Sequence, residues 1–284
     1  MTMTQSKTIV VTGGAGFIGS HLCERLVKDG HKVISLDNYF TGSKENHVSG
    51  VDYREGHTKD IEKHVSENPD IIFHLGEYAR VEQSLEEPGL VWDLNTAGTF
   101  GILEFWRKKK NKLVYAGSST KFGDGGLARV ATPYAWTKAA NTELVKNYSD
   151  WYGLPYAITY FYNVYGPRER EGKYGTVVEI FRQKMKRTEP LTVEEPGTQV
   201  RNFTHIGDII DGLILVGEKG EGNEFGLGSS EAIAILDLAK MFGGQIQMIP
   251  SRKGNRMESS LDTTKSKALG WSAQQKLSDY VKRL

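Results

Sequence analysis

Residues 8–37 read TIVVTGGAGFIGSHLCERLVKDGHKVISLD, and this order of residue types predicts a strand, a helix and a second strand. Residues 9–11 form a continuous apolar run, as expected of a strand that is buried on both faces of a parallel sheet. Apolar residues then recur at helical spacing over 17–27, and Gly30 ends the helix. The apolar segment 32–36 is the second strand, so the whole stretch is a βαβ unit.

Three glycines at three-residue spacing, Gly13, Gly16 and Gly19, join the first strand to the helix. Glycines at such a junction let the backbone approach a pyrophosphate, which the positive end of the helix attracts. Asp37 ends the second strand, where a carboxylate accepts hydrogen bonds from an adenosine ribose. Because this carboxylate repels a 2′-phosphate, the pattern predicts a site for NAD rather than NADP. The alternative is a merely structural turn.

Composition excludes several classes of protein. A chain of 284 residues suits one large domain or a large and a small one. Its net charge of +1 gives no reason to expect nucleic acid or a membrane surface as a partner, and no segment approaches membrane-spanning length. The single cysteine, Cys23, allows no internal disulfide, and the chain has no apolar N-terminal segment, so we expect a cytoplasmic protein. We expect no metal site.

The strand predicted over 70–76 ends in an unusual group of residues. Small residues such as Gly76 at the carboxyl end of a strand permit close approach to a cofactor. Glu77 follows directly and brings a charge to the wall of the cofactor or substrate site. His74 is more often a hydrogen-bonded core histidine than a catalyst.

Tyr134 and Lys138 lie four residues apart on a helix predicted to begin at Pro133, so they share one helical face. A free phenol is not a base at neutral pH, but a neighbouring ammonium stabilises the phenolate form. Ser118 arrives from the end of the strand that begins at Leu113 and can hydrogen-bond a substrate oxygen that alternates between hydroxyl and ketone. These three residues predict an acid–base site, and the alternative is a surface tyrosine–lysine pair.

These motifs together resemble those of the extended short-chain dehydrogenase/reductase family, which includes the nucleotide-sugar epimerases and dehydratases. The resemblance extends from Thr8 to Trp271. It implies an α/β fold, a Rossmann-like doubly wound parallel sheet with a smaller discontinuous α/β substrate lobe. We expect residues 1–165 to form mainly the NAD-binding domain and residues 166–284 mainly the substrate-binding lobe, with 202–216 returning to the first domain.

The segment 118–123 narrows the reaction that the resemblance implies. Its sequence, Ser-Ser-Thr-Lys-Phe-Gly, resembles the epimerase pattern Ser-Ala-Thr-Val-Tyr-Gly and lacks the Thr-Asp-Glu of the 4,6-dehydratases. The resemblance favours an NAD-dependent nucleotide-sugar 4-epimerase acting on a UDP-hexose through a transient 4-keto sugar. The alternatives are a 4-keto reductase, a dehydratase or a decarboxylase of the same family, or a catalytically silent NAD-binding regulatory protein. Glu77, Lys121 and Tyr160 depart from the family's pattern.

The resemblance also assigns roles to individual residues. Those assigned to catalysis are Ser118, Tyr134 and Lys138. Those assigned to the cofactor are Gly13, Gly16, Phe17, Ile18, Gly19, Asp37, Asn38, Asp60, Ile61, Leu75, Gly76, Asn95, Ala116, Tyr134, Lys138, Tyr162 and Val164. Those assigned to a nucleotide-diphosphate sugar are Ser118, Thr120, Tyr134, Asn163, Thr176, Val177, Arg201 and Arg252. Asp60 suits a helix cap equally well, and Asn95 would brace the active site from a helix.

Members of the family usually form homodimers through two helices of each subunit, here expected around 93–108 and 134–152. These segments carry several aromatic residues that would suit such an interface or, equally, the core: Trp106, Trp136, Tyr148, Trp151 and Tyr152. We therefore expect a homodimer.

Overall fold

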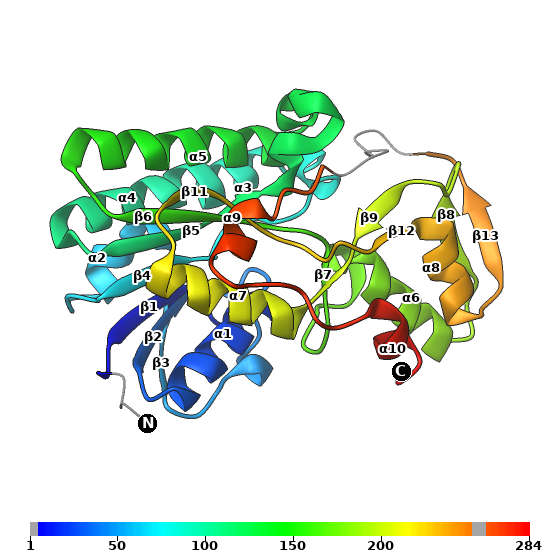
Figure 1. Cartoon of the computed structure of the whole chain (residues 1–284), viewed down its shortest axis with the longest axis horizontal. Helices are drawn as coiled ribbons and strands as arrows, with labels where there is room; N and C mark the ends of the chain where they lie inside the picture. The colour runs from blue at the N-terminus through cyan, green and yellow to red at the C-terminus, as the bar shows by residue number, and fades with distance from the viewer. Residues whose placement is uncertain (1–4, 252–259) are drawn as a thin grey trace.

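A seven-stranded parallel sheet forms the centre of the computed structural model, which describes residues 5–251 and 260–284 (Figure 1). The strands run in the order β11-β6-β5-β4-β1-β2-β3, and every neighbouring pair is parallel. Their bounds are β1 (Thr8–Thr12), β2 (Lys32–Asp37), β3 (Val51–Glu55), β4 (Ile71–His74), β5 (Lys112–Ser118), β6 (Tyr156–Phe161) and β11 (Gly222–Leu227). The strand order reverses between β1 and β4, so the carboxyl ends of these strands mark the crevice where ligands bind in such sheets. This confirms the predicted doubly wound sheet.

Helices cover both faces of the sheet, because alternate side chains of each buried strand point to opposite faces. Ile9 and Val11 of β1 pack with α1 (Phe17–Lys28) and α7 (Ile206–Lys219), whereas Val10 packs toward the other face. That other face is covered by α2 (Ile61–His64), α4 (Gly98–Lys109) and α5 (Pro133–Tyr152) (Figure 1). The continuous apolar run of β1 therefore supplies two cores at once.

The helix before the catalytic elements contains a π-helical turn. Pro88 starts α3 (Pro88–Val91), which continues through the π-helical η4 (Trp92–Ala97) into α4. Such turns are rare and often stand at functional sites. The remaining helical turns are the 3₁₀ segments η1 (Lys44–Asn46), η2 (Thr58–Asp60), η3 (Gln83–Leu85), η5 (Ser119–Val130) and η6 (Gly172–Tyr174).

A smaller α/β lobe lies beside the sheet and has its own core, built around Phe181, Val193 and Leu238 (Figure 1). Its main elements are α6 (Val177–Lys186), β8 (Leu191–Glu194), β9 (Val200–Asn202), β12 (Ala232–Ala234), α8 (Ile235–Phe242), β13 (Ile246–Ile249) and α10 (Leu277–Val281). Two short strands, β7 (Val164–Tyr165) and β10 (Thr204–His205), pair with each other, and α9 (Thr264–Ala268) follows later. The strand β11 belongs to the large sheet, and α7 packs against one of its faces.

Two of the residues that depart from the family's pattern, Lys121 and Tyr160, contact each other. The Nζ atom of Lys121 lies 5.9 Å from the centre of the Tyr160 ring and 3.4 Å from Oε1 of Glu143. Tyr160 is buried, and its hydroxyl donates to Oδ1 of Asn223 over 2.7 Å. A cation above an aromatic ring stabilises modestly, so this pair is a packing feature beside β6.

Candidate active site

The turn after β1 excludes side chains where a ligand approaches. Gly13 has φ +74°, and a Cβ there would lie 2.9 Å from Cα of Gly76. A Cβ on Gly19 would lie 2.1 Å from the carbonyl oxygen of Gly13. No side chain caps α1 at Gly16. This turn therefore brings bare backbone to the positive end of a helix, the arrangement that binds a pyrophosphate.

Asp37 is held in place by two backbone N–H groups. Its Oδ2 accepts from Ala15 over 2.9 Å, and its Oδ1 accepts from Tyr39 over 2.8 Å. Burial nevertheless raises the pKa of the carboxyl from its ordinary value. Within residues 5–251 and 260–284, Asp37 forms no ion pair, so its negative charge is left to meet a ligand. An unpaired carboxylate favours ribose hydroxyls and disfavours a 2′-phosphate.

One cavity connects this turn to Tyr134 and Lys138, two of the three predicted catalytic residues. The predicted cofactor residues that line it are Gly13, Gly16, Phe17, Ile18, Gly19, Asp37, Asn38, Leu75, Gly76, Ala116, Tyr134 and Lys138. The glycine cradle, the carboxylate and the tyrosine–lysine pair thus share a single space. These residues fit a bound NAD.

Several predicted cofactor residues do not line this cavity. Asp60 does not line it: its carboxylate pairs with Lys63 over 2.8 Å, and that hydrogen bond lowers the pKa of Asp60. Asp60 stands at the N-cap position of α2, as predicted, but its side chain makes no capping hydrogen bond. The ring of His57 caps the preceding η2 and accepts from the N–H of Lys59 over 3.0 Å. Ile61 is fully buried in the core below α4.

Tyr162 also turns away from the cavity. It is 1% exposed, and its hydroxyl donates to the carbonyl oxygen of Ser260 over 2.9 Å. Phe161 lines the cavity instead, since successive side chains of an extended segment point in opposite directions. Val164 is 9% exposed and packs in the core with α7.

The predicted catalytic residues lie together at the carboxyl ends of β4 and β5. The hydroxyl of Tyr134 donates to Oγ of Ser118 over 3.1 Å, and Oγ of Ser118 lies 2.8 Å from Oγ1 of Thr120. Tyr134 and Lys138 line the same cavity from α5, as their spacing predicts. The arrangement can hold a substrate oxygen between a serine hydroxyl and a phenol, which is the geometry of acid–base catalysis.

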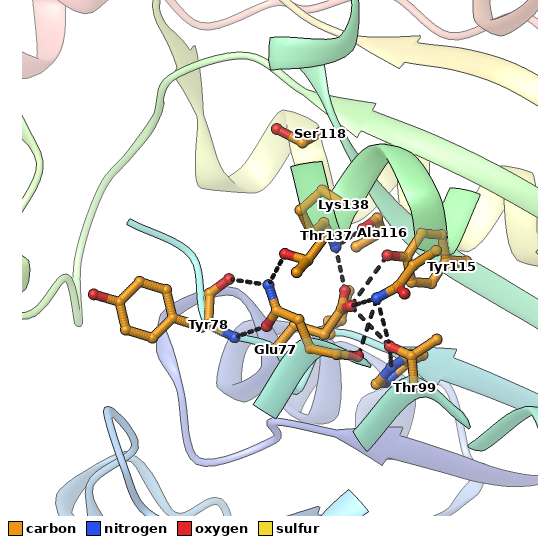
Figure 2. A network of polar contacts seen from close by, with 12 residues as sticks. Glu77, Tyr78, Thr99, Tyr115, Ala116, Ser118, Thr137 and Lys138 are labelled. Atoms are coloured by element: carbon orange, nitrogen blue, oxygen red, sulfur yellow. Dashed lines mark hydrogen bonds and ion pairs between the residues drawn. The ribbon is translucent and has the colours of Figure 1, made fainter. Parts of the chain in front are cut away.

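Lys138 has a buried carboxylate partner that the sequence analysis did not identify (Figure 2). Its Nζ atom donates to Oε2 of Glu77 and to the carbonyl oxygen of Ala116. The side chains of Lys138 and Glu77 are only 5% and 3% exposed. Glu77 directly follows a strand end, and this position was the only signal of its importance in the sequence.

The Glu77 carboxylate accepts hydrogen bonds from four side chains (Figure 2). Besides Lys138, three side chains donate to its Oε1: Thr99 over 2.8 Å, Asn141 over 2.9 Å and Tyr115 over 3.1 Å. Burial alone would raise the pKa of Glu77, but the charge of Lys138 and the hydrogen bonds outweigh it and lower that pKa. The carboxylate is therefore ionised beside the cavity.

His74 has a structural position, as expected. Its Nδ1 lies 2.8 Å from Oγ1 of Thr12, and its Nε2 lies 3.0 Å from Oγ1 of Thr99. The ring is completely buried, and burial lowers its pKa to about 4. His74 is therefore neutral near pH 7.

Asn95 occupies the bracing position that the resemblance implied. Its Oδ1 accepts from the N–H of Tyr78 over 2.6 Å, and its Nδ2 donates to Oγ1 of Thr137 over 3.1 Å. Thr137 in turn donates to the carbonyl oxygen of Tyr134 over 3.0 Å. The π-helical turn thus joins the cavity wall at Tyr78 to the helix that carries Tyr134 and Lys138.

Arg80 is a further cavity residue that the sequence analysis missed. Its guanidinium donates to the carbonyl oxygens of Tyr174 and Ala79, and burial lowers its pKa. Within the described part of the chain no carboxylate forms an ion pair with it, although Glu169 lies near enough to attract it. Burial raises the pKa of Glu169 to about 7. Arg80 therefore adds positive charge to the wall near Tyr134.

The predicted substrate residues beyond Tyr134 lie outside the cavity lining. Asn163 has φ +39°, and its Nδ2 lies 3.4 Å from the carbonyl oxygen of Asn202. The N–H of Thr176, the residue before α6, donates to Oε1 of Glu169 over 2.8 Å. Val177 begins α6, and Arg201 lies on β9 with Nη1 2.8 Å from the carbonyl oxygen of Val200. Arg252 lies outside the described residues.

Residues 5–251 and 260–284 contain neither a membrane-spanning helix nor a metal-binding group of side chains. None of the helices there is long and apolar enough to cross a membrane. No group of three or more histidine, cysteine, aspartate or glutamate side chains among those residues is placed to hold a metal ion.

Comparisons with known proteins agree with this geometry. A family model described as the NAD-dependent epimerase/dehydratase family matches residues 9–228. A protein of Methanocaldococcus jannaschii, provisionally named a UDP-glucose 4-epimerase, is 31% identical over 297 residues, which covers 97% of this chain and 96% of its own. The UDP-N-acetyl-alpha-D-glucosaminuronate decarboxylase of Bacillus cytotoxicus is 30% identical and covers 82% of this chain and 78% of its own. The crystal structure of Thermotoga maritima UDP-glucose 4-epimerase with UDP-glucose superposes with a TM-score of 0.91 at 29% identity, covering 97% of this chain and 96% of that chain.

Proposed function

We propose that this chain, which belongs to the NAD-dependent epimerase/dehydratase family of enzymes, is a nucleotide-sugar 4-epimerase acting on a UDP-hexose. The observation that carries the proposal is the contact of Tyr134 with Ser118, 3.1 Å long, beside Lys138 in the cavity that fits NAD. Ser119 and Thr120 follow Ser118, so the acid pair of the dehydratases is absent from this position. The relative with UDP-glucose bound supports the substrate class.

In the proposed reaction, Tyr134 transfers the proton, and Ser118 and Lys138 support it by hydrogen bonding and charge. NAD, when bound, supplies acceptance and return of the hydride at C4 of the sugar. Tyr134, as phenolate, takes the proton from the C4 hydroxyl and gives it back after the 4-keto sugar has turned. Ser118 donates a hydrogen bond to the C4 oxygen, and the ammonium of Lys138 stabilises the phenolate and can bond a ribose hydroxyl.

The substrate's diphosphate needs anchors outside the reacting centre, so that the sugar can turn while the nucleotide stays bound. We assign this role to Arg201 and Arg252, because a guanidinium presents two parallel donors to phosphate oxygens. Asn163, Thr176 and Val177 are assigned to the same ligand. Thr176 and Val177 stand at the start of α6 and Arg201 on β9, so we propose that the smaller lobe contacts the nucleotide diphosphate while the sugar reaches Tyr134.

Proton NMR of the purified protein with UDP-, GDP- and dTDP-sugars, and with no cofactor added, tests the proposal. We expect a new anomeric signal from the C4 epimer and a loss of rate of at least about 100-fold in Tyr134→Phe. Turnover only after NADH or NADPH is supplied would indicate a reductase. Release of carbon dioxide from a UDP-uronate would indicate a decarboxylase, the activity named for the Bacillus cytotoxicus relative. An inert panel with intact NAD binding would favour a silent regulatory protein.

We further propose a cytoplasmic homodimer, with residues 1–165 mainly forming the NAD-binding domain. Trp136 is 46% exposed, Trp151 61% and Tyr152 48%, and Trp136 stacks on the exposed Trp92 at 6.1 Å. In contrast, Trp106 and Tyr148 from the same predicted aromatic set are buried in the core. Exposed aromatic residues along α5 support an interface there. Light scattering of Trp151→Arg against the wild type tests it, and an unchanged mass would refute this interface.

A further inference from the structure

Glu77 is a buried acid that the proposed reaction does not use, yet it contacts the lysine on which that reaction depends (Figure 2). It comes from the end of β4, whereas Lys138 is on α5, 61 residues away. Its four donors come from α4, β5 and α5. A carboxylate held from three elements has little freedom to move, so its charge has a fixed place in the site.

The contacts of Lys138 limit what its ammonium can do. An ammonium has three N–H donors. One is directed at Glu77 and a second at the carbonyl oxygen of Ala116. Nζ also lies 4.5 Å from the centre of the Tyr115 ring, and within residues 5–251 and 260–284 it makes no third hydrogen bond. The remaining N–H can therefore serve the cavity, which Lys138 lines together with Tyr134. Glu77 and Ala116 thereby orient the one donor that can reach a ligand.

The same pairing alters the charge that Tyr134 experiences. An isolated ammonium would favour the phenolate strongly, but a carboxylate in contact with that ammonium cancels part of the effect. The other titratable groups that face the pair are His74 from β4, which is neutral because burial lowers its pKa to about 4, and Tyr115 from β5, whose pKa burial raises well above its ordinary value. On the cavity side, Arg80 adds positive charge. Glu77 is thus the ionised acid in direct contact with Lys138.

We propose that Glu77 is a positioning residue, whose carboxylate holds the ammonium of Lys138 in place and sets how strongly that charge favours the phenolate of Tyr134. The inference rests on the proposed function for its role in catalysis. The effect of Glu77 on the ionisation of Tyr134 can be measured without any turnover of substrate.

The test is an ultraviolet difference titration of phenolate in the purified full chain. The chain has 13 tyrosines, so each protein is compared with its Tyr134→Phe counterpart to isolate one phenol. In Glu77→Gln the amide oxygen still accepts from Lys138, but the negative charge is gone. We expect the phenolate of Tyr134 to form at a pH lower by about one unit. The low-pH side of the kcat profile should move with it.

Matched variants separate this role from a purely structural one. Tyr115→Phe removes a neutral hydrogen bond from the same carboxylate and keeps its charge, so the titration midpoint should not move. Glu77→Asp keeps the charge on a shorter side chain and should move the midpoint less than Glu77→Gln, which provides a second measurement if the glutamine variant does not fold. A midpoint in Glu77→Gln that is unchanged or higher than in the wild type overturns the inference. If the midpoint is lowered in Glu77→Gln while the wild-type chain turns over no sugar, the inference is supported and the proposed function is refuted.

Discussion

The Lys138–Glu77 pair makes a quantitative prediction about stability. Lys138→Met removes the ammonium and leaves the Glu77 side chain, which is 3% exposed, without its cationic partner. The carboxylate then keeps hydrogen bonds from Thr99, Tyr115 and Asn141 only. Breaking a buried pair by deleting one partner costs about 3–5 kcal/mol. We expect this loss in the free energy of unfolding of Lys138→Met at pH 7.

A double variant shows that the loss comes from the charge left behind. Glu77→Gln combined with Lys138→Met places two neutral side chains of similar volume in the same space. The double variant should be more stable than Lys138→Met alone by about 2 kcal/mol, because no unpaired charge is buried.

The pH dependence has a definite sign. In the wild type the pKa of Glu77 is lowered, so its stabilising contribution is present above the ordinary glutamate value and is lost as pH falls through the folded value. Without Lys138, burial would raise the pKa of Glu77 above its value in the unfolded chain. The free-energy cost of burying the ionised carboxylate is therefore present at pH 7, and it decreases as pH falls because Glu77 becomes protonated. The stability gap between the wild type and Lys138→Met should therefore narrow between pH 7 and pH 5.

Urea unfolding followed by far-ultraviolet circular dichroism measures the free energy of unfolding of the wild type, Glu77→Gln, Lys138→Met and the double variant, which together form a double-mutant cycle. Equal slopes against urea concentration would show that the variants unfold from comparable native states. If the losses of unfolding free energy in the two single variants simply add in the double variant, the buried ion pair does not stabilise the fold. The same follows if the stability difference between the wild type and Lys138→Met does not depend on pH.

Three further predictions concern the cofactor turn and the core. In Gly19→Ala the new Cβ would lie 2.1 Å from the carbonyl oxygen of Gly13, so the turn must open, and calorimetric titration should show NAD affinity reduced by more than about 10-fold; unchanged affinity would contradict the cradle. Asp37→Ser should weaken NAD binding about 10-fold and lessen the rejection of NADP, so the ratio of the two dissociation constants should fall toward one, and an unaltered ratio would show that another group excludes the 2′-phosphate. His74 has a folded pKa of about 4 against 6.5 when unfolded, so the unfolded chain binds a proton that the folded chain does not, and stability should fall as pH decreases from 6.5 to 4. His74→Gln should lose that contribution to the pH dependence in urea unfolding, whereas an identical pH profile would mean that His74 does not stay neutral.

The βαβ unit, the dinucleotide turn and the Tyr134–Lys138 pair follow from local patterns in the sequence. The run at residues 9–11, the glycine spacing and Asp37 predict a βαβ unit with a dinucleotide turn, because backbone geometry alone relates residues so close in the chain. The four-residue spacing of Tyr134 and Lys138 places both on one helical face for the same reason, and both line the cavity. These features need no knowledge of distant contacts.

The tertiary structure decided what long-range packing controls. It paired Glu77 with Lys138 across 61 residues, brought Lys121 to Tyr160, and turned Phe161 rather than Tyr162 into the cavity. No periodicity encodes such contacts, because they depend on strand register and on how helices settle on the sheet. Local spacing therefore determined which chemical groups the chain offers, and the contact of the loop after β4 with α5 determined the electrostatic setting in which Lys138 works.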